Sequence, residues 1–178
     1  LTPSPTIPTP RYDASKFSAN AAVGSATITY TSNSTATLSY TINGISGTKQ
    51  ITRELFSDGV NISVSVGDVW WGGNEQNGWG MNISHQGSVL FPVWYTYDEA
   101  GRATWYTMPG GRWNGATYTG DLYYSTSSAW LGVPYDVRLF TPAKVGQISI
   151  TFIDENTATV TFNVNGVVRT GTISRQPY

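Results

Sequence analysis

Glu75 and Asp98 are the two carboxylates whose settings best suit acid–base chemistry. A glycosidase places such a pair on either side of the scissile bond. Glu75 lies in the polar loop 74–78, between Trp71 and Trp79, whereas Asp98 opens a four-residue turn. An aspartate in that turn position usually accepts hydrogen bonds from backbone amides, so we interpret Asp98 as a turn residue. For Glu75, loop stabilisation and ligand contact both stay open.

The chain has one histidine, His85, and no cysteine. A protein metal site usually takes several imidazole, thiolate or carboxylate ligands. The G-x-S-x-G turn that presents a hydrolase serine does not occur in the sequence. His85 directly precedes Gln86-Gly87, and we interpret it as a turn-stabilising residue. The sequence therefore predicts no catalytic residue, no metal and no cofactor.

Aromatic residues are the stronger candidates for a binding role. The chain holds seven Trp and eleven Tyr, most of them between residues 70 and 130. Flat aromatic faces offer apolar area on which a sugar ring can stack, although cross-strand aromatic pairs in a core would need the same residues. We predict a ligand-binding site from the residues that bracket the loop 72–78 and the hairpin after it. These residues are Trp71, Glu75, Trp79, Trp94, Trp105 and Tyr106.

Two pairs of these aromatics are consecutive in predicted strands, namely Trp94-Tyr95 and Trp105-Tyr106. Successive side chains of a strand point to opposite faces of the sheet. One member of each pair is therefore expected in the core. The other is expected to be exposed, to line a barrel, or to be covered by another sheet.

The composition narrows the function classes. Only 12% of residues are charged and the net charge is −1, so the chain lacks the basic surface that nucleic acid requires. No apolar stretch is as long as a membrane helix. Low charge with many hydroxyl and indole groups is typical of secreted β-proteins, so we expect a secreted or cell-surface protein with no membrane span.

An internal repeat organises the chain. Residues 23–56 and 145–178 align without a gap at an offset of 122, and each contains an Asn-Gly pair, at Asn43-Gly44 and Asn165-Gly166. Asn-Gly is the preferred pair for a two-residue hairpin turn. Each copy therefore reads as about three antiparallel strands. The match reaches upstream, so that 12–56 is equivalent to 135–178.

The segment 66–178 offers roughly eight strands, a number that suits a closed barrel or two packed sheets. Apolar and polar residues alternate in it with the period of a half-buried strand, and no sustained helical period occurs. We therefore predict an all-β antiparallel meander that forms an eight-stranded barrel or a two-sheet sandwich at 66–178. A three-stranded partial repeat at 24–56 precedes it.

The predicted organisation has three parts: a Thr/Pro-rich linker at 1–11, the partial repeat at 12–56, and the complete β-unit at 66–178. The partial repeat has an apolar face that must be buried elsewhere. We expect residues 24–56 to associate either with their own chain or with a second molecule.

The middle segment WWGGNEQNGWGMNISHQGSVLFPVWYTYDEAGRATWY resembles a repeat of secreted proteobacterial proteins. That repeat reads W-N-x-x-E-S-G-W-G, then N-x-x-H-Q-G, then W-[FY]-T-Y-D-x-x-G-x-x-x-W, and it ends with an N-G-V hairpin and I-[TS]-R-Q-x-[FY]. The resemblance covers about 66–178, with Asn77 in place of the usual Ser. It implies secretion, and either a tandem arrangement or a position C-terminal to a secreted hydrolase.

Three functions follow as hypotheses. The first is a non-catalytic extracellular module that binds a glycan or other extended polymer through exposed aromatics. The second is a structural or assembly subunit of a surface layer or filament. The third, ranked last, is an enzyme with Glu75 and Asp98 as its carboxylates and His85 as an assistant.

Overall fold

A computed structural model gives the structure of the protein and describes residues 21–57, 65–76, 78–128 and 132–177. Antiparallel strands make up nearly all of its regular structure, which confirms the predicted all-β class. The helical elements within these ranges are two short 3₁₀ turns, η2 (Asn74–Gln76) and η3 (Val137–Leu139). Among the described residues, no helix has the length and hydropathy needed to cross a membrane.

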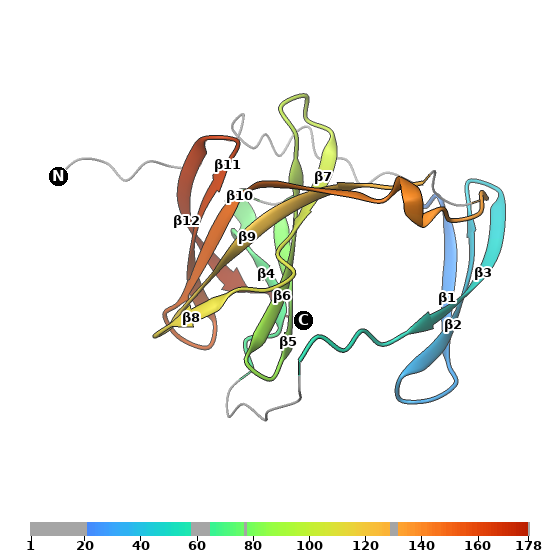
Figure 1. Ribbon diagram of the computed structural model, residues 1–178, viewed down its shortest axis with the longest axis horizontal. Helices are drawn as coiled ribbons and strands as arrows, with labels where there is room; N and C mark the ends of the chain where they lie inside the picture. The colour runs from blue at the N-terminus through green and yellow to red at the C-terminus, as the bar shows by residue number, and fades with distance from the viewer. Residues whose placement is uncertain (1–20, 58–64, 77, 129–131, 178) are drawn as a thin grey trace. The chain divides into compact units, whose positions relative to one another are not determined.

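The strands belong to two separate sheets (Figure 1). The smaller sheet contains β1 (Gly24–Tyr30), β2 (Thr35–Ile42) and β3 (Ile45–Thr52). The larger sheet contains β4 (Asp68–Trp71), β5 (Gly80–Gln86), β6 (Val89–Tyr97), β7 (Ala103–Thr107), β8 (Arg112–Asn114), β9 (Thr117–Thr126), β10 (Thr141–Phe152), β11 (Thr157–Val164) and β12 (Val167–Arg175).

The larger sheet closes into an eight-stranded barrel. Its strands follow the order β10-β11-β12-β4-β5-β6-β7-β9, and β10 then pairs with β9. The sequence left open whether these strands form a barrel or a two-sheet sandwich, and the closing pair shows that they form a barrel. The short strand β8 pairs with β9 outside this circuit, and the sequence pattern does not predict it.

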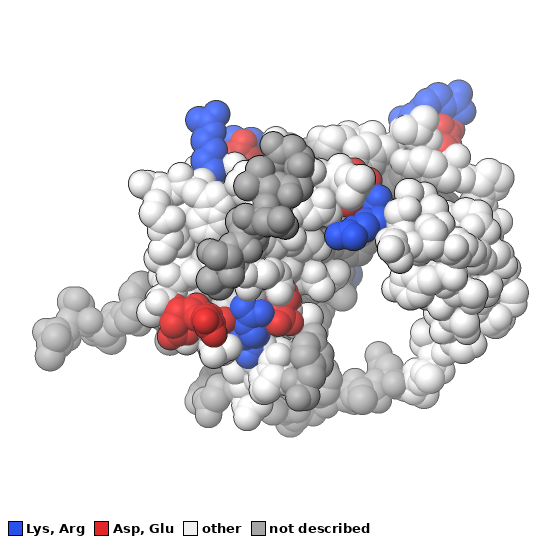
Figure 2. All heavy atoms as spheres, turned by 90° about the horizontal axis from the view of Figure 1, so that it is seen from below, with Lys and Arg blue, Asp and Glu red and all other residues white. Residues whose placement is uncertain are grey.

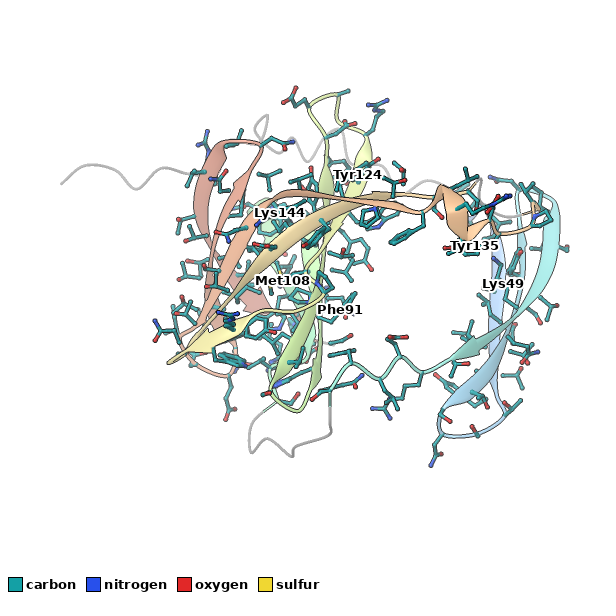
Figure 3. The ribbon with its side chains drawn as sticks, in the orientation of Figure 1. Lys49, Phe91, Met108, Tyr124, Tyr135 and Lys144 are labelled. Carbon is teal, nitrogen blue, oxygen red and sulfur yellow. The ribbon has the colours of Figure 1, made fainter. Side chains whose placement is uncertain are left out.

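Apolar side chains fill the barrel interior. An eight-stranded barrel is just wide enough for its own side chains to occupy the inside. The buried cluster draws on every barrel strand except β7, through Trp70, Met81, Ile83, Leu90, Trp94, Met108, Tyr118, Leu122, Ile148, Ile150, Ala158, Val160, Phe162 and Ile173. Met108 follows directly after β7 and is labelled in Figure 3.

The seam between β12 and β4 is short, with the pairs Ser174↔Trp71 and Arg175↔Trp70. Arg175 reinforces this seam. Its Nη1 donates to Asp68 Oδ2 at 2.6 Å, and its Nε donates to the Glu155 carbonyl at 2.8 Å. Its guanidinium also lies 5.1 Å from the ring centroid of Trp70. Such charge-assisted contacts are stronger than neutral hydrogen bonds.

Asp68→Asn is expected to weaken the seam in a pH-dependent way. Hydrogen bonds from the Arg175 side chain and the Val69 amide lower the pKa of Asp68 below its ordinary 3.8. A lowered pKa in the folded state stabilises the protein above the unfolded pKa, and that contribution is lost as pH falls through the folded pKa. At pH 7 the variant should lose about 1–2 kcal/mol of unfolding free energy.

Urea unfolding at pH 7 and near pH 3 tests this prediction. The gap between wild type and Asp68→Asn should narrow in acid, because the wild-type carboxyl becomes protonated as well. A gap of equal size at both pH values would contradict the assigned role of Asp68.

The small sheet repeats the hydrogen-bond register of β10–β12. Gly24 faces Ile42 as Gly146 faces Val164, and the whole ladder follows with the offset of 122. Both Asn-Gly turns have positive φ at both residues, 51° and 79° in the first copy and 49° and 86° in the second. These are the torsions of a type I′ turn, which confirms the predicted hairpins.

The described residues form two compact units. One unit contains the barrel. The other contains β1–β3 together with the connection from β9 to β10, which runs from residue 126 to 141. Within this second unit, a Cβ built on Gly132 would lie 3.5 Å from Ile45 Cγ2, so the connection approaches the start of β3. The sequence pattern groups residues 126–141 with the complete β-unit instead.

Candidate functional site

A row of aromatic side chains crosses the outer face of the barrel. The registers Trp71↔Gly80, Gly80↔Tyr95 and Tyr95↔Trp105 place four residues side by side on β4, β5, β6 and β7. Tyr95 is 52% exposed and Trp105 is 54% exposed. We call Trp71, Gly80, Tyr95 and Trp105 the outer row.

Gly80 leaves a gap in the outer row between Trp71 and Tyr95. A Cβ on Gly80 would lie 2.9 Å from the Trp70 carbonyl oxygen, so close backbone approach requires glycine there. Adjacent strands lie about 4.8 Å apart, which sets the two flanking rings roughly 9–10 Å apart at their backbones. A flat ring placed between two others needs about 7–8 Å, twice an ordinary carbon–carbon contact. At the backbone, the gap is therefore wide enough for one sugar-sized ring.

The gap opens onto a shallow pocket of about 200 Å³. Its lining combines aromatic rings with two neutral amides, since Trp71, Trp79 and Tyr95 lie beside Asn82 and Gln176. An amide side chain donates and accepts hydrogen bonds, as recognition of a hydroxyl group requires. The backbone amide of Gln176 donates to the Val69 carbonyl at 2.9 Å, which holds this residue against β4.

The loop 72–78 borders the pocket through Gly78, and Trp79 follows it directly. Trp79 is half-buried and packs against the barrel core. Its ring lies across Gly72, where a Cβ would come within 2.7 Å of Trp79 Cζ2. Glu75 belongs to η2, but its side chain lies outside the described part of the structure, so its ligand contact stays a prediction.

Trp94 and Tyr106 face the barrel interior. Trp94 is only 7% exposed, and its ring centroid lies 4.6 Å from that of Phe162 and 5.5 Å from that of Tyr106. Burial also raises the pKa of the Tyr106 hydroxyl. Of the six predicted residues, the structure thus places Trp71, Trp79 and Trp105 towards the pocket and the outer row. It places Trp94 and Tyr106 inside, and the sixth is Glu75.

Asp98 holds the turn between β6 and β7, as the sequence predicts. Its carboxylate accepts hydrogen bonds from the amides of Ala100 and Arg102 and from Arg102 Nε, at 2.8–3.0 Å. The Arg102 amide is the main reason that the pKa of Asp98 is lowered. This carboxylate is ionised and committed to the turn.

His85 also has a structural contact. It is the penultimate residue of β5 rather than a turn residue, and its Nδ1 accepts a hydrogen bond from the Val66 amide at 3.2 Å. Burial lowers its pKa. Across the described ranges, no group of three or more acidic, histidine or cysteine side chains is arranged to hold a metal ion.

A second groove lies beside β8, with a volume of about 660 Å³. Trp113, Asp121 and Gln147 are among its lining residues. The Trp113 indole donates to the Ser88 carbonyl at 2.8 Å, and its ring packs 4.9 Å from that of Tyr118, measured between centroids. This groove has two aromatic rings in its lining, Trp113 and Tyr123, and the Trp113 indole is already hydrogen-bonded, whereas the outer row has three rings beside a gap.

Sequence reasoning missed three residues of the pocket: Tyr95, Asn82 and Gln176. The alternation in β6 shows that Trp94 and Tyr95 face opposite ways, but Tyr95 becomes the exposed partner only because the barrel encloses Trp94. Gly80 between two aromatic strands was the available signal, because a glycine inside a strand often marks a close approach of backbone or ligand.

Comparison of the chain with models of known protein families, with curated proteins and with solved structures gives no match.

Proposed function

We propose that the protein is a non-catalytic module that binds a neutral glycan, or an extended polymer of similar chemistry, along the outer row. The observation that carries this proposal is the register of Trp71, Tyr95 and Trp105 around the gap at Gly80. Exposed aromatic rings in such a line contact the apolar faces of successive units of a chain.

The surroundings of the outer row favour a ligand without charge. Its pocket presents amides and indoles, and none of the residues lining it is charged. Over the whole chain only 12% of residues are charged, and most of the face shown in Figure 2 belongs to other residue types. A polyanion would find little electrostatic attraction on a chain with net charge −1.

A binding role rather than catalysis is supported by the contacts of two described carboxylates. Asp98 is engaged by its turn, and Asp68 is engaged by Arg175. A pair of glycosidase carboxylates would instead face one sugar-sized space from two sides. Secretion or display at the cell surface fits the low charge and the resemblance to repeats of secreted proteobacterial proteins.

A structural or assembly role is the second candidate, and one observation favours it. The sheet β1–β3 exposes apolar side chains, with Ile28 and Ile51 52% and 37% exposed. Exposed apolar faces of this kind mark interaction sites.

Removing Tyr95 and Trp105 tests the binding proposal. The full chain is titrated with soluble hydroxyethyl cellulose, xylan and galactomannan, and binding is followed by tryptophan fluorescence. The variant Tyr95→Ala/Trp105→Ala should weaken binding of the preferred polymer by about 1–3 kcal/mol, because each stacked ring contributes about 0.5–1.5 kcal/mol.

The matched control is Tyr30→Ala, which removes an exposed ring from β1 and leaves the outer row intact. It should bind like the wild type. Equal binding by the wild type and the double variant would reject the outer row as the site.

A further inference from the structure

The three strands β10–β12 are the element that closes the barrel. Strand β10 pairs with β9 at one edge, and β12 pairs with β4 at the other. The middle of its inner face is enclosed, and Ile150 and Ile173 are both 0% exposed. The barrel therefore shows what a sheet of this design packs against, namely the open sheet formed by β4–β7 and β9.

The sheet β1–β3 has the same design but is not enclosed in this way. Ile28 and Ile51 are the counterparts of Ile150 and Ile173 at the offset of 122, and both are exposed, while Ala36 between them is buried as its counterpart Ala158 is. In the described part of the chain, neither β1 nor β3 pairs with a further strand. Unpaired edges and an apolar face are together the features of a sheet that docks.

The two faces of β1–β3 differ in chemistry. The face that carries Ile28 also carries Leu38 and Ile51. The opposite face carries a hydroxyl or amide side chain at each position of the three strands, namely Ser25, Thr27, Thr29, Thr35, Thr37, Ser39, Thr41, Ser46, Thr48, Gln50 and Thr52. Such a face is suited to water. The apolar face is therefore the one that docks.

Arg53 extends the equivalence to the edge of the sheet. It is the counterpart of Arg175, which binds Asp68 and lies over Trp70 at the barrel seam. Its backbone amide donates to the Ser34 carbonyl at 2.7 Å, as that of Arg175 donates to the Asn156 carbonyl at 2.9 Å. Arg53 is exposed and positioned, by this equivalence, for an aspartate and an indole of a strand like β4.

The described residues alone, in any number of copies, do not supply a barrel partner for every such sheet. The described residues contain two closing sheets, β1–β3 and β10–β12, and one set of strands β4–β9. Any number of copies keeps this two-to-one ratio. If β1–β3 of one copy replaced β10–β12 in the barrel of another copy, the displaced β10–β12 would be left without a barrel.

We propose that β1–β3 docks as the closing sheet of a second barrel, on an open β-segment of the β4–β9 type that lacks a closing sheet of its own. The docked register follows from the barrel: Thr52 would face the counterpart of Trp71, and Arg53 would face the counterpart of Trp70. This interaction involves the inner face of β1–β3 and is separate from the outer row.

Lys49 sets one requirement on the partner. It occupies the position of Gly171, which faces Val160 inside the barrel register, and it projects from β3 where Figure 3 labels it. Enclosing an unpaired ammonium is costly. The partner strands should therefore place a carboxylate, or a channel open to water, beside Lys49. In the barrel of this chain, the residue at the equivalent position is Gly171, which needs neither.

To test the proposal, the open β-segment that β1–β3 should dock on is added to the same polypeptide chain. A second copy of residues 58–134 is fused to the N-terminal side of Tyr12, so that it runs into 12–56 as the original runs into 135–178. Lys49→Gly is included so that the ammonium does not block closure. The natural chain has no cysteine, so Ile28→Cys reports burial of the inner face by its rate of thiol labelling.

In the extended chain, Ile28→Cys should label about tenfold or more slowly than in the unextended chain, because labelling would require local opening. Thr29→Cys, on the outer face of the same strand, should label equally in both chains. Thr52→Cys should form a disulfide with a cysteine at the added copy of Trp71, and Ser46→Cys should not. Unchanged labelling of Ile28→Cys together with no Thr52→Cys cross-link would overturn the proposal.

Discussion

Ile150→Ala is expected to destabilise the barrel by about 2–5 kcal/mol, whereas Ile28→Ala should leave the barrel unaffected. The two residues hold equivalent positions in the repeat, facing Val160 and Leu38 respectively. Ile150 is 0% exposed, and its removal would leave a cavity that rigid barrel strands cannot collapse around. Ile28 is 52% exposed, so its removal takes away little buried area.

Urea unfolding followed by tryptophan fluorescence measures this difference, because six of the seven tryptophans, all except Trp130, belong to the barrel unit. The midpoint should fall for Ile150→Ala and stay at the wild-type value for Ile28→Ala. Equal losses from the two variants would show that β1–β3 is enclosed in the same way as β10–β12.

Trp94→Ala should cost about 3–5 kcal/mol of unfolding free energy, while Trp105→Ala should cost less than about 1 kcal/mol. The two residues lie on neighbouring strands but on opposite faces of the barrel wall. Trp94 packs against Phe162 from across the barrel and against Tyr106 from β7. Trp105 is more than half exposed and has solvent on its outer side.

Thermal unfolding of both variants checks this pair, with polymer binding as the second readout. Trp105→Ala should keep the wild-type melting temperature and lose affinity. Trp94→Ala should melt at a lower temperature. If Trp94→Ala kept its stability but lost affinity for the polymer, Trp94 would be a ligand-binding residue. That result would contradict its placement in the core.

The hairpins of both repeats could be predicted from sequence because their determinants are local. Asn-Gly fixes a two-residue turn, and the turn fixes every pair along the ladder. The opposition of Val164 to Val167 and of Phe162 to Arg169 follows from that turn alone, and the structure contains both pairs. The turn at Asp98 is local in the same way, since its bonds reach only as far as Arg102.

The candidate site was less predictable because it depends on closure. Strand alternation separates Trp94 from Tyr95, but it cannot say which ring the barrel encloses. The seam from β12 to β4 and the pairing of β9 with β10 decide this, and both join residues distant in sequence. The strand β8 escaped prediction because three residues are too few to show a period of two.

Indole resonances of the seven tryptophans provide the most direct measurement of where a polymer binds. On titration of the full chain with the polysaccharide that it binds best, the Nε1–H signals of Trp71 and Trp105 should shift, while those of Trp70 and Trp94 should stay. This pattern would place the ligand on the outer row. Shifts confined to Trp113, or no shift with any neutral polysaccharide, would contradict the proposed function.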